Sequence, residues 1–212
     1  GDGAPATLDP AAITHPLDLA LLARLSNLID ESTTAFEGYD YARALERTES
    51  FFWNFCDEYL ELVKGRAYGS FGDDAAASAQ TTLRIALSAL LRLFAPFLPY
   101  VTEEVWSWWQ AGSVHRASWP TTAELGAGAG TGDPLTYDVA GKVLGEVRKA
   151  KTEAKRSLRA EVDHVLVRDT DARIDALRAA LDDLKEAGRV AAVDLEVAPE
   201  ASVVVTLAPE EA

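Results

Sequence analysis

The sequence predicts a mainly α-helical protein, in which an antiparallel helical bundle is followed by a small α/β subdomain. Three observations lead to this fold class. Apolar residues recur at helical spacing over three long segments, 17–36, 40–64 and 73–95, which are joined by short Gly-containing connections. A stretch of Gly, Ala and Thr then covers residues 121–132. After it, runs rich in Val alternate with helical patterns, which is typical of a small α/β layer.

The segment 40–64 is the expected centre of the bundle. It carries an apolar stripe and an opposite polar stripe, both with steps of three and four residues, which a helix places on two faces. Because residues between the stripes are also apolar, several neighbours must pack around this helix. Asp40 is a suitable N-cap. The apolar stripe is Tyr41, Leu45, Thr48, Phe52, Phe55, Tyr59 and Leu62, and the polar stripe is Arg43, Arg47, Ser50, Asn54, Asp57 and Glu61.

Two arginines on the polar stripe, Arg43 and Arg47, stand four residues apart. Like charges at this spacing repel unless an anion lies near them. Two interpretations follow. The anion is either a carboxylate on a neighbouring helix or a phosphate group of a ligand.

The rest of the bundle is expected to end near residue 120. Pro96 ends the third helix, Thr102 is expected to cap a short helix, and residues 114–118 are expected to form a brief strand. Three tryptophans crowd the short helix. Such aromatics can stack nucleobases, but few basic residues lie nearby, so packing within the core is the favoured interpretation. These residues are Trp106, Trp108 and Trp109.

The second unit begins with a basic helical segment. Its apolar residues from Val143 to Leu158 form one stripe, and four cations line up on another face. These cations either form a solvated face or contact an anion such as RNA. They are Arg148, Lys151, Lys155 and Arg159.

The end of the chain is expected to hold one helix and three strands. The strand at 163–168 precedes a helix at 171–187, and the strands at 190–197 and 203–207 are expected to form a hairpin. The resulting domain organisation is a tether at 1–16, the bundle at 17–120, a flexible linker at 121–135 and the α/β subdomain at 136–212.

Composition excludes several functional classes. The net charge of −14 is unlike that of a general nucleic-acid binder, although the basic helix is a local exception. Cys56 is the only cysteine, so no internal disulfide forms, and with no activating partner it is expected to be a small core residue. No metal-ligand spacing and no apolar run long enough for a membrane span is visible. Because the chain lacks Met and begins with Gly, we expect a fragment or a processed product.

Two motifs, in this order, resemble the anticodon-binding region of class I aminoacyl-tRNA synthetases. Residues 52–64 contain Trp-Asn-Phe-Cys-Asp-Glu-Tyr, and residues 91–106 contain Pro-Phe-Leu-Pro-Tyr-Val-Thr-Glu-Glu. Their spelling is most like that of valyl enzymes. Residues 113–120 and 143–207 are also similar to the corresponding parts of actinobacterial valyl enzymes.

The resemblance implies that this chain recognises the anticodon stem-loop of tRNA(Val) and that the parent enzyme, with ATP, attaches valine to it. The chain itself is expected to hold no catalytic residue, no metal and no cofactor, since neither synthetase signature motif is present. The partners are expected to be tRNA(Val) and the catalytic domain of the same polypeptide, in a cytoplasmic monomer without membrane contact. The alternatives are a leucyl or isoleucyl enzyme and a helical protein-interaction module.

The resemblance also suggests which residues contact tRNA. The amide of Asn54 can pair with a base edge, Arg43 and Arg47 can bind phosphate, and Trp53 can stack an unpaired base. In the second unit, the basic stripe is expected to contact the RNA backbone. The complete set of candidate tRNA-binding residues is Arg43, Arg47, Trp53, Asn54, Asp57, Arg148, Lys151, Lys155 and Arg159.

Overall fold

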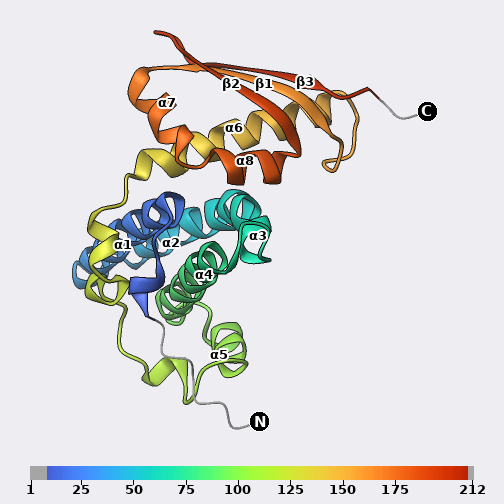
Figure 1. The fold of residues 1–212 in the computed structure, drawn as a ribbon. Coiled ribbons are helices and arrows are strands. Elements are labelled where there is room, and N and C mark those ends of the chain that lie inside the picture. Colours follow the sequence, from blue (N-terminus) through green and yellow to red (C-terminus); the bar gives the residue numbers. More distant parts are fainter. Residues whose placement is uncertain (1–8, 210–212) are drawn as a thin grey trace. The chain divides into compact units, whose positions relative to one another are not determined.

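The computed structural model describes residues 9–209 and confirms the predicted fold class, a helical bundle with a small α/β part (Figure 1). Contacts divide the chain into two compact units. The first unit runs to Phe55 and resumes at Ala77–Gly132, and the second comprises Cys56–Ala76 and the residues from Asp133 onward. The domain boundaries inferred from the sequence, which place residues 17–120 in one bundle, stay a prediction.

The first unit contains α1 (Pro16–Glu37), α2 (Tyr41–Asn54), most of α4 (Asp73–Phe94) and α5 (Pro99–Ser107). A 3-10 turn at Pro10–Ala12 precedes α1, and the first eight residues of the expected tether lie outside the described residues. Leucines of α1 such as Leu21 and Leu25 are completely buried, as their helical spacing predicts. Gly38 ends α1, as predicted, and Asp40 caps α2 by accepting from the Arg43 amide.

The expected single helix over 40–64 is interrupted by one π-helical turn. This turn, η2 (Phe55–Tyr59), separates α2 from α3 (Leu60–Ala67), which belongs to the second unit. The apolar stripe is buried at Thr48, Phe55, Tyr59 and Leu62. At the start of α2 the prediction is wrong, because the side chain of Tyr41 is 47% exposed.

The segment that follows α4 differs from the prediction in two places. α5 begins at Pro99, so Thr102 lies inside the helix and its hydroxyl donates to the Leu98 carbonyl. Residues 114–116 form a 3-10 turn rather than a strand. Trp106 packs with Leu91 and Val114, and Trp109 packs against the same cluster, which confirms the packing interpretation for these two tryptophans.

The segment expected to be a flexible linker is instead folded onto α1. It forms the 3-10 turns Thr122–Leu125 and Ala127–Gly130, in which the side chains of Leu125 and Ala129 are buried. A Cβ atom at Gly132 would lie 2.0 Å from the Leu19 carbonyl oxygen, so only glycine fits. The small residues that suggested flexibility therefore allow close packing.

The second unit is a three-stranded sheet with helices on one face (Figure 1). Its elements are α6 (Pro134–Glu153), β1 (Val162–Asp169), α7 (Asp171–Arg178), α8 (Leu181–Gly188), β2 (Val190–Val197) and β3 (Ser202–Leu207), together with α3. The strand order is β2-β1-β3, with β1 parallel to β2 and antiparallel to β3. The predicted β2–β3 hairpin is therefore wrong, and the predicted helix at 171–187 is divided into α7 and α8.

Candidate nucleic-acid interface

Helices α1 and α2 form an antiparallel pair along which their polar faces meet. The Phe36 and Tyr41 rings lie 5.1 Å apart at the connecting end, and Glu31 pairs with Arg47 in the middle. At the other end, Arg24 and Asn54 line one pocket. The polar stripe predicted for the central helix therefore borders α1, over the length of α2, about 21 Å at 1.5 Å per residue.

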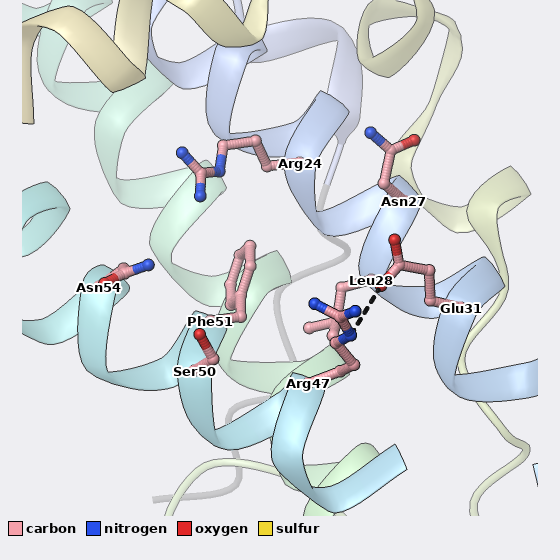
Figure 2. A pocket seen from close by; sticks show the side chains of 8 residues that line it. All are labelled: Arg24, Asn27, Leu28, Glu31, Arg47, Ser50, Phe51 and Asn54. Atoms are coloured by element: carbon pink, nitrogen blue, oxygen red, sulfur yellow. Dashed lines mark ion pairs between the residues drawn. The ribbon is translucent and has the colours of Figure 1, made fainter. Parts of the chain in front are cut away.

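The first of two adjoining pockets is a shallow hollow of about 230 Å³. Figure 2 shows the Phe51 ring in its middle, with the Arg24 and Arg47 guanidinium groups and the Asn54 amide around the ring. The hollow therefore brings two guanidinium groups and a side-chain amide around one aromatic ring. The lining residues are Arg24, Asn27, Leu28, Glu31, Arg47, Ser50, Phe51 and Asn54.

The second pocket continues along the same helices toward their connecting loop and has a volume of about 540 Å³. It shares Glu31 and Arg47 with the first pocket. We call the two pockets together the α1–α2 groove. Its further lining residues are Asp30, Thr34, Ala35, Gly38, Asp40 and Arg43.

The groove contains both acidic and basic side chains. Their positions determine whether Arg47 and Arg43 are neutralised by a carboxylate of the protein. Arg47 Nε lies 3.6 Å from Glu31 Oε2, in an ion pair whose two side chains are about half exposed. A carboxylate on a neighbouring helix is therefore the partner of Arg47, which confirms one of the two interpretations drawn from the sequence. Within residues 9–209, the Arg43 guanidinium has no ion pair. It lies exposed beside the second pocket, where it can bind an anionic ligand.

Two site residues that were predicted on the segment 40–64, Trp53 and Asp57, lie outside the groove. Trp53 is 60% exposed, packs edge-on against Phe52 at 5.3 Å and does not line either pocket. Asp57 belongs to the π-helical turn and to the second unit. Its backbone carbonyl accepts a hydrogen bond of 2.5 Å from Arg148, which also pairs with Glu61 at 3.3 Å.

The predicted exposed stripe of four cations on the basic helix is wrong. Lys151 is 1% exposed, and its ammonium group donates to the carbonyls of Leu158 and Gly188. The helix ends at Glu153, so Lys155, which adopts a left-handed conformation, and Arg159 lie beyond it. Only Arg148 of the four remains on an accessible face of α6, and it is already engaged by Asp57 and Glu61.

Burial sets the ionisation of Lys151. Removal from water lowers the pKa of its ammonium group, the Glu161 carboxylate opposes this, and the guanidinium groups of Arg189, Arg148 and Arg156 lower it further. The two carbonyl acceptors satisfy the group inside the fold. Lys151 therefore supports the packing of the second unit rather than an RNA surface.

Sequence reasoning missed two groove residues, Arg24 and Asn27. Both lie on the polar side of α1, each four residues before another lining residue, Leu28 and Glu31 respectively. The spacing of Arg24, Asn27 and Glu31, three and then four residues, indicates a polar face of α1 but does not indicate what that face borders. Only the pairing with α2 shows that these side chains border the same space as Asn54.

The remaining reactive groups give no sign of catalysis. Burial, and then the Asp57 carboxylate, raise the pKa of the half-buried Cys56 thiol, which disfavours the nucleophilic thiolate. Residues 9–209 contain no group of three or more His, Cys, Asp or Glu side chains that could hold a metal ion. Over the same residues, no helix combines the length and the hydrophobicity that a membrane span requires.

Comparison with known proteins identifies the protein family to which the chain belongs. Residues 18–166 match the family model described as the anticodon-binding domain of tRNA ligase. Since the match covers more than half of the described chain, the protein belongs to this family. The groove between α1 and α2 lies within the matched residues.

The relatives with high identity are valine–tRNA ligases of bacteria. The chain is 55% identical to the enzyme of Thermobifida fusca (strain YX) over 205 residues, which cover 96% of this chain and 23% of the relative. It is 48% identical to the enzyme of Leifsonia xyli subsp. xyli over its whole length, 25% of that relative. The enzyme of Salinispora tropica is 48% identical over 91% of the chain. The resemblance to actinobacterial valyl enzymes is thus confirmed, and the chain spans about a quarter of the length of these relatives.

Proposed function

We propose that this chain binds the anticodon stem-loop of tRNA(Val) as part of a valine–tRNA ligase. In this proposal a catalytic region elsewhere in the polypeptide attaches valine with ATP, and the chain itself contributes binding only. The protein acts as a monomer in the cytoplasm. The observation that carries the proposal is the α1–α2 groove, which gathers three arginines and two asparagines within the residues that match the family.

The chemistry of the groove suits a single-stranded RNA loop. The amides of Asn27 and Asn54 each offer a donor and an acceptor, which is the pair that a base edge requires. Arg24, Arg43 and Arg47 can bind phosphate oxygens. Unpaired loop bases expose the edges that such groups recognise, whereas the deep major groove of an RNA helix does not.

The acidic net charge of the chain predicts a weak salt dependence of RNA binding. With a net charge of −14, the chain lacks the cationic surplus that drives binding to any nucleic acid. Three arginines would release few counterions, so log K should fall with log salt at a slope of about −2 for this part of the interface. Affinity would then depend on base recognition more than on total charge.

Other candidate residues have separate roles in the proposal. Trp53 is exposed and available to stack an unpaired base. Lys155 and Arg159, which follow α6, remain proposed contacts to the RNA backbone. Asp57 and Arg148 instead join η2 to α6 through a hydrogen bond, and buried Lys151 is not proposed as an RNA contact.

The test is a binding comparison with the full-length protein. tRNA with a valine anticodon should bind more tightly than the same tRNA with an altered anticodon, and tRNAs for leucine and isoleucine should compete poorly. Arg47→Ala should weaken binding, whereas Arg84→Ala, which removes an exposed arginine of α4 outside the groove, should not. Equal affinity for all of these tRNAs would contradict the proposal.

A further inference from the structure

The connection between α1 and α2 holds an aromatic residue in a conformation that aromatic residues rarely adopt. Tyr39 has a φ of 61°, in the left-handed region, directly after the C-cap Gly38. The Tyr39 amide donates to Phe36 and the Asp40 amide donates to Ala35, which is the hydrogen-bond pattern of a Schellman motif. Glycine usually occupies the position of Tyr39 in this motif, because it lacks the Cβ atom that crowds the backbone.

Packing within the chain does not explain this tyrosine. Its side chain is 81% exposed, so it buries little apolar surface in return for the unfavourable backbone conformation. Glycine precedes it at a position with a negative φ, where a side chain would be tolerated more easily. A bulky exposed side chain at a strained position is a feature that ligand contacts commonly account for.

A series of aromatic contacts links Tyr39 to the rest of the first unit. The Tyr39 ring meets the Tyr41 ring edge-on at 6.4 Å, and Tyr41 packs on Phe36 at 5.1 Å. Phe36 in turn contacts Phe97 and Trp119. The Tyr39 ring is therefore the exposed end of this series.

Tyr39 lies in the connection between α1 and α2, at the loop end of the α1–α2 groove. Its two sequence neighbours, Gly38 and Asp40, line the second pocket together with Arg43. A ligand that extends along the groove from Asn54 past Arg47 and Arg43 would therefore reach Tyr39 at the end. Arg43 and Arg47 in the second pocket favour an anionic ligand, and an exposed aromatic ring can stack on any nucleobase.

We infer that Tyr39 stacks an unpaired nucleobase of the RNA whose loop lies in the α1–α2 groove. The inference rests on the proposed function and extends it, because it adds a contact at the opposite end of the groove from Asn54. Stacking accepts every base, so Tyr39 contributes affinity and loop placement rather than discrimination between anticodons. The occupant is an RNA base rather than an apolar protein segment, since the pocket at this end of the groove is lined by charged side chains that include Arg43 and Arg47.

The test uses the full-length protein with Tyr39→Gly and Tyr39→Phe. Tyr39→Gly should weaken binding of tRNA with a valine anticodon by about tenfold, the size of one lost stacking contact. It should not lower Tm, since glycine prefers this conformation. Tyr39→Phe keeps the ring and should bind within about twofold of the unaltered protein. The salt dependence of binding should be the same in all three proteins, because stacking releases no counterions.

Two controls separate the possible outcomes. Tyr100→Ala removes a 90% exposed tyrosine of α5, a helix that contributes no residue to the groove, and it should leave binding unchanged. An RNA duplex without a loop should bind Tyr39→Gly and the unaltered protein equally. If the unaltered protein discriminates anticodons but Tyr39→Gly binds as tightly, the inference fails and the proposed function stands. If tRNA binds the unaltered protein without anticodon preference, the proposed function fails, and the inference falls with it.

Discussion

Arg47 Nε lies 3.6 Å from Glu31 Oε2 in the middle of the α1–α2 groove, so a cation proposed to bind RNA is paired with a carboxylate in the free protein. The ion pair is half exposed, and exposed pairs contribute about 1 kcal/mol or less. A phosphate can therefore compete with Glu31 for this guanidinium at small cost. The carboxylate also repels any phosphate that approaches the groove.

Replacing Glu31 should strengthen RNA binding. Glu31→Gln removes the competing charge and should lower the Kd for tRNA about two- to fivefold, as expected for an exposed pair. Titration of labelled tRNA at fixed salt measures the effect. Glu49→Gln, which removes an exposed carboxylate of α2 outside the groove, is the matched control. Weaker binding by Glu31→Gln would show that Glu31 orients Arg47 instead of competing for it.

The buried ion pair between Arg66 and Asp183 should be important for the stability of the second unit. Arg66 Nε lies 3.0 Å from Asp183 Oδ1, both side chains are 1% exposed, and the pair joins α3 to α8. Asp183→Asn leaves the guanidinium buried without its counter-charge, so the free energy of unfolding should fall by about 3–5 kcal/mol. Urea unfolding measures this change. Replacing both residues with leucine should cost less than the single change, and the opposite order would contradict the explanation.

Lys151 should affect stability in a pH-dependent way. Its pKa is lowered in the folded chain, so as pH rises through that value the folded chain releases a proton that the unfolded chain still holds, and stability increases. Lys151→Met should abolish this increase. It should also lower stability near neutral pH by about 1–3 kcal/mol, because the carbonyls of Leu158 and Gly188 lose their donor.

Thermal unfolding at several alkaline pH values checks the Lys151 prediction. Lys149→Met removes an exposed lysine from the same helix and serves as the control. If Lys151→Met leaves stability unchanged and weakens tRNA binding, the result would contradict the packing role and indicate that Lys151 contacts RNA.

Glu124 should contribute to stability above the acidic range. Burial alone would raise the pKa of its carboxyl group, but hydrogen bonds from Arg92 and Thr121 and the charge of Arg92 together lower it. The contribution is therefore complete at neutral pH and is lost as pH falls through the lowered value. Since the side chain is 40% exposed, the loss should be about 1 kcal/mol or less. Glu124→Gln should flatten this acid-dependent part of the Tm profile, and an unchanged profile would exclude the ion pair as its cause.

Local periodicity located the helical segments, although not their interruptions, and it did not give the pairing of the strands. The spacing of apolar residues placed α1 at 17–36, close to its observed bounds of Pro16–Glu37. The four residues between β2 and β3 are typical of a hairpin, yet β3 pairs with the opposite edge of β1. The helices α7 and α8 connect β1 to β2 and allow parallel pairing, and this preference depends on packing that no local pattern reports.

The candidate site could be predicted only in part, because local spacing reports one helix at a time and not how two helices pack. Arg43, Arg47 and Asn54 follow from the polar stripe of one helix. Arg24 and Asn27 join them only because α1 packs beside α2. Burial of Lys151 depends on acceptors at Leu158 and Gly188, and the latter lies 37 residues away in the sequence. The regular spacing of basic residues therefore suggested a surface that tertiary contacts remove.

Asn54→Ala tests whether the α1–α2 groove reads the anticodon, because this amide lies in the groove and can recognise a base edge. The measurement is the ratio of Kd values of the full-length protein for tRNA with an altered anticodon and for tRNA with a valine anticodon, together with Tm. Loss of the Asn54 amide should reduce this ratio about tenfold, the value of one base-specific contact, in a protein that Tm shows to be folded. An unchanged ratio of Kd values, with or without a lower Tm, would contradict anticodon reading by the α1–α2 groove.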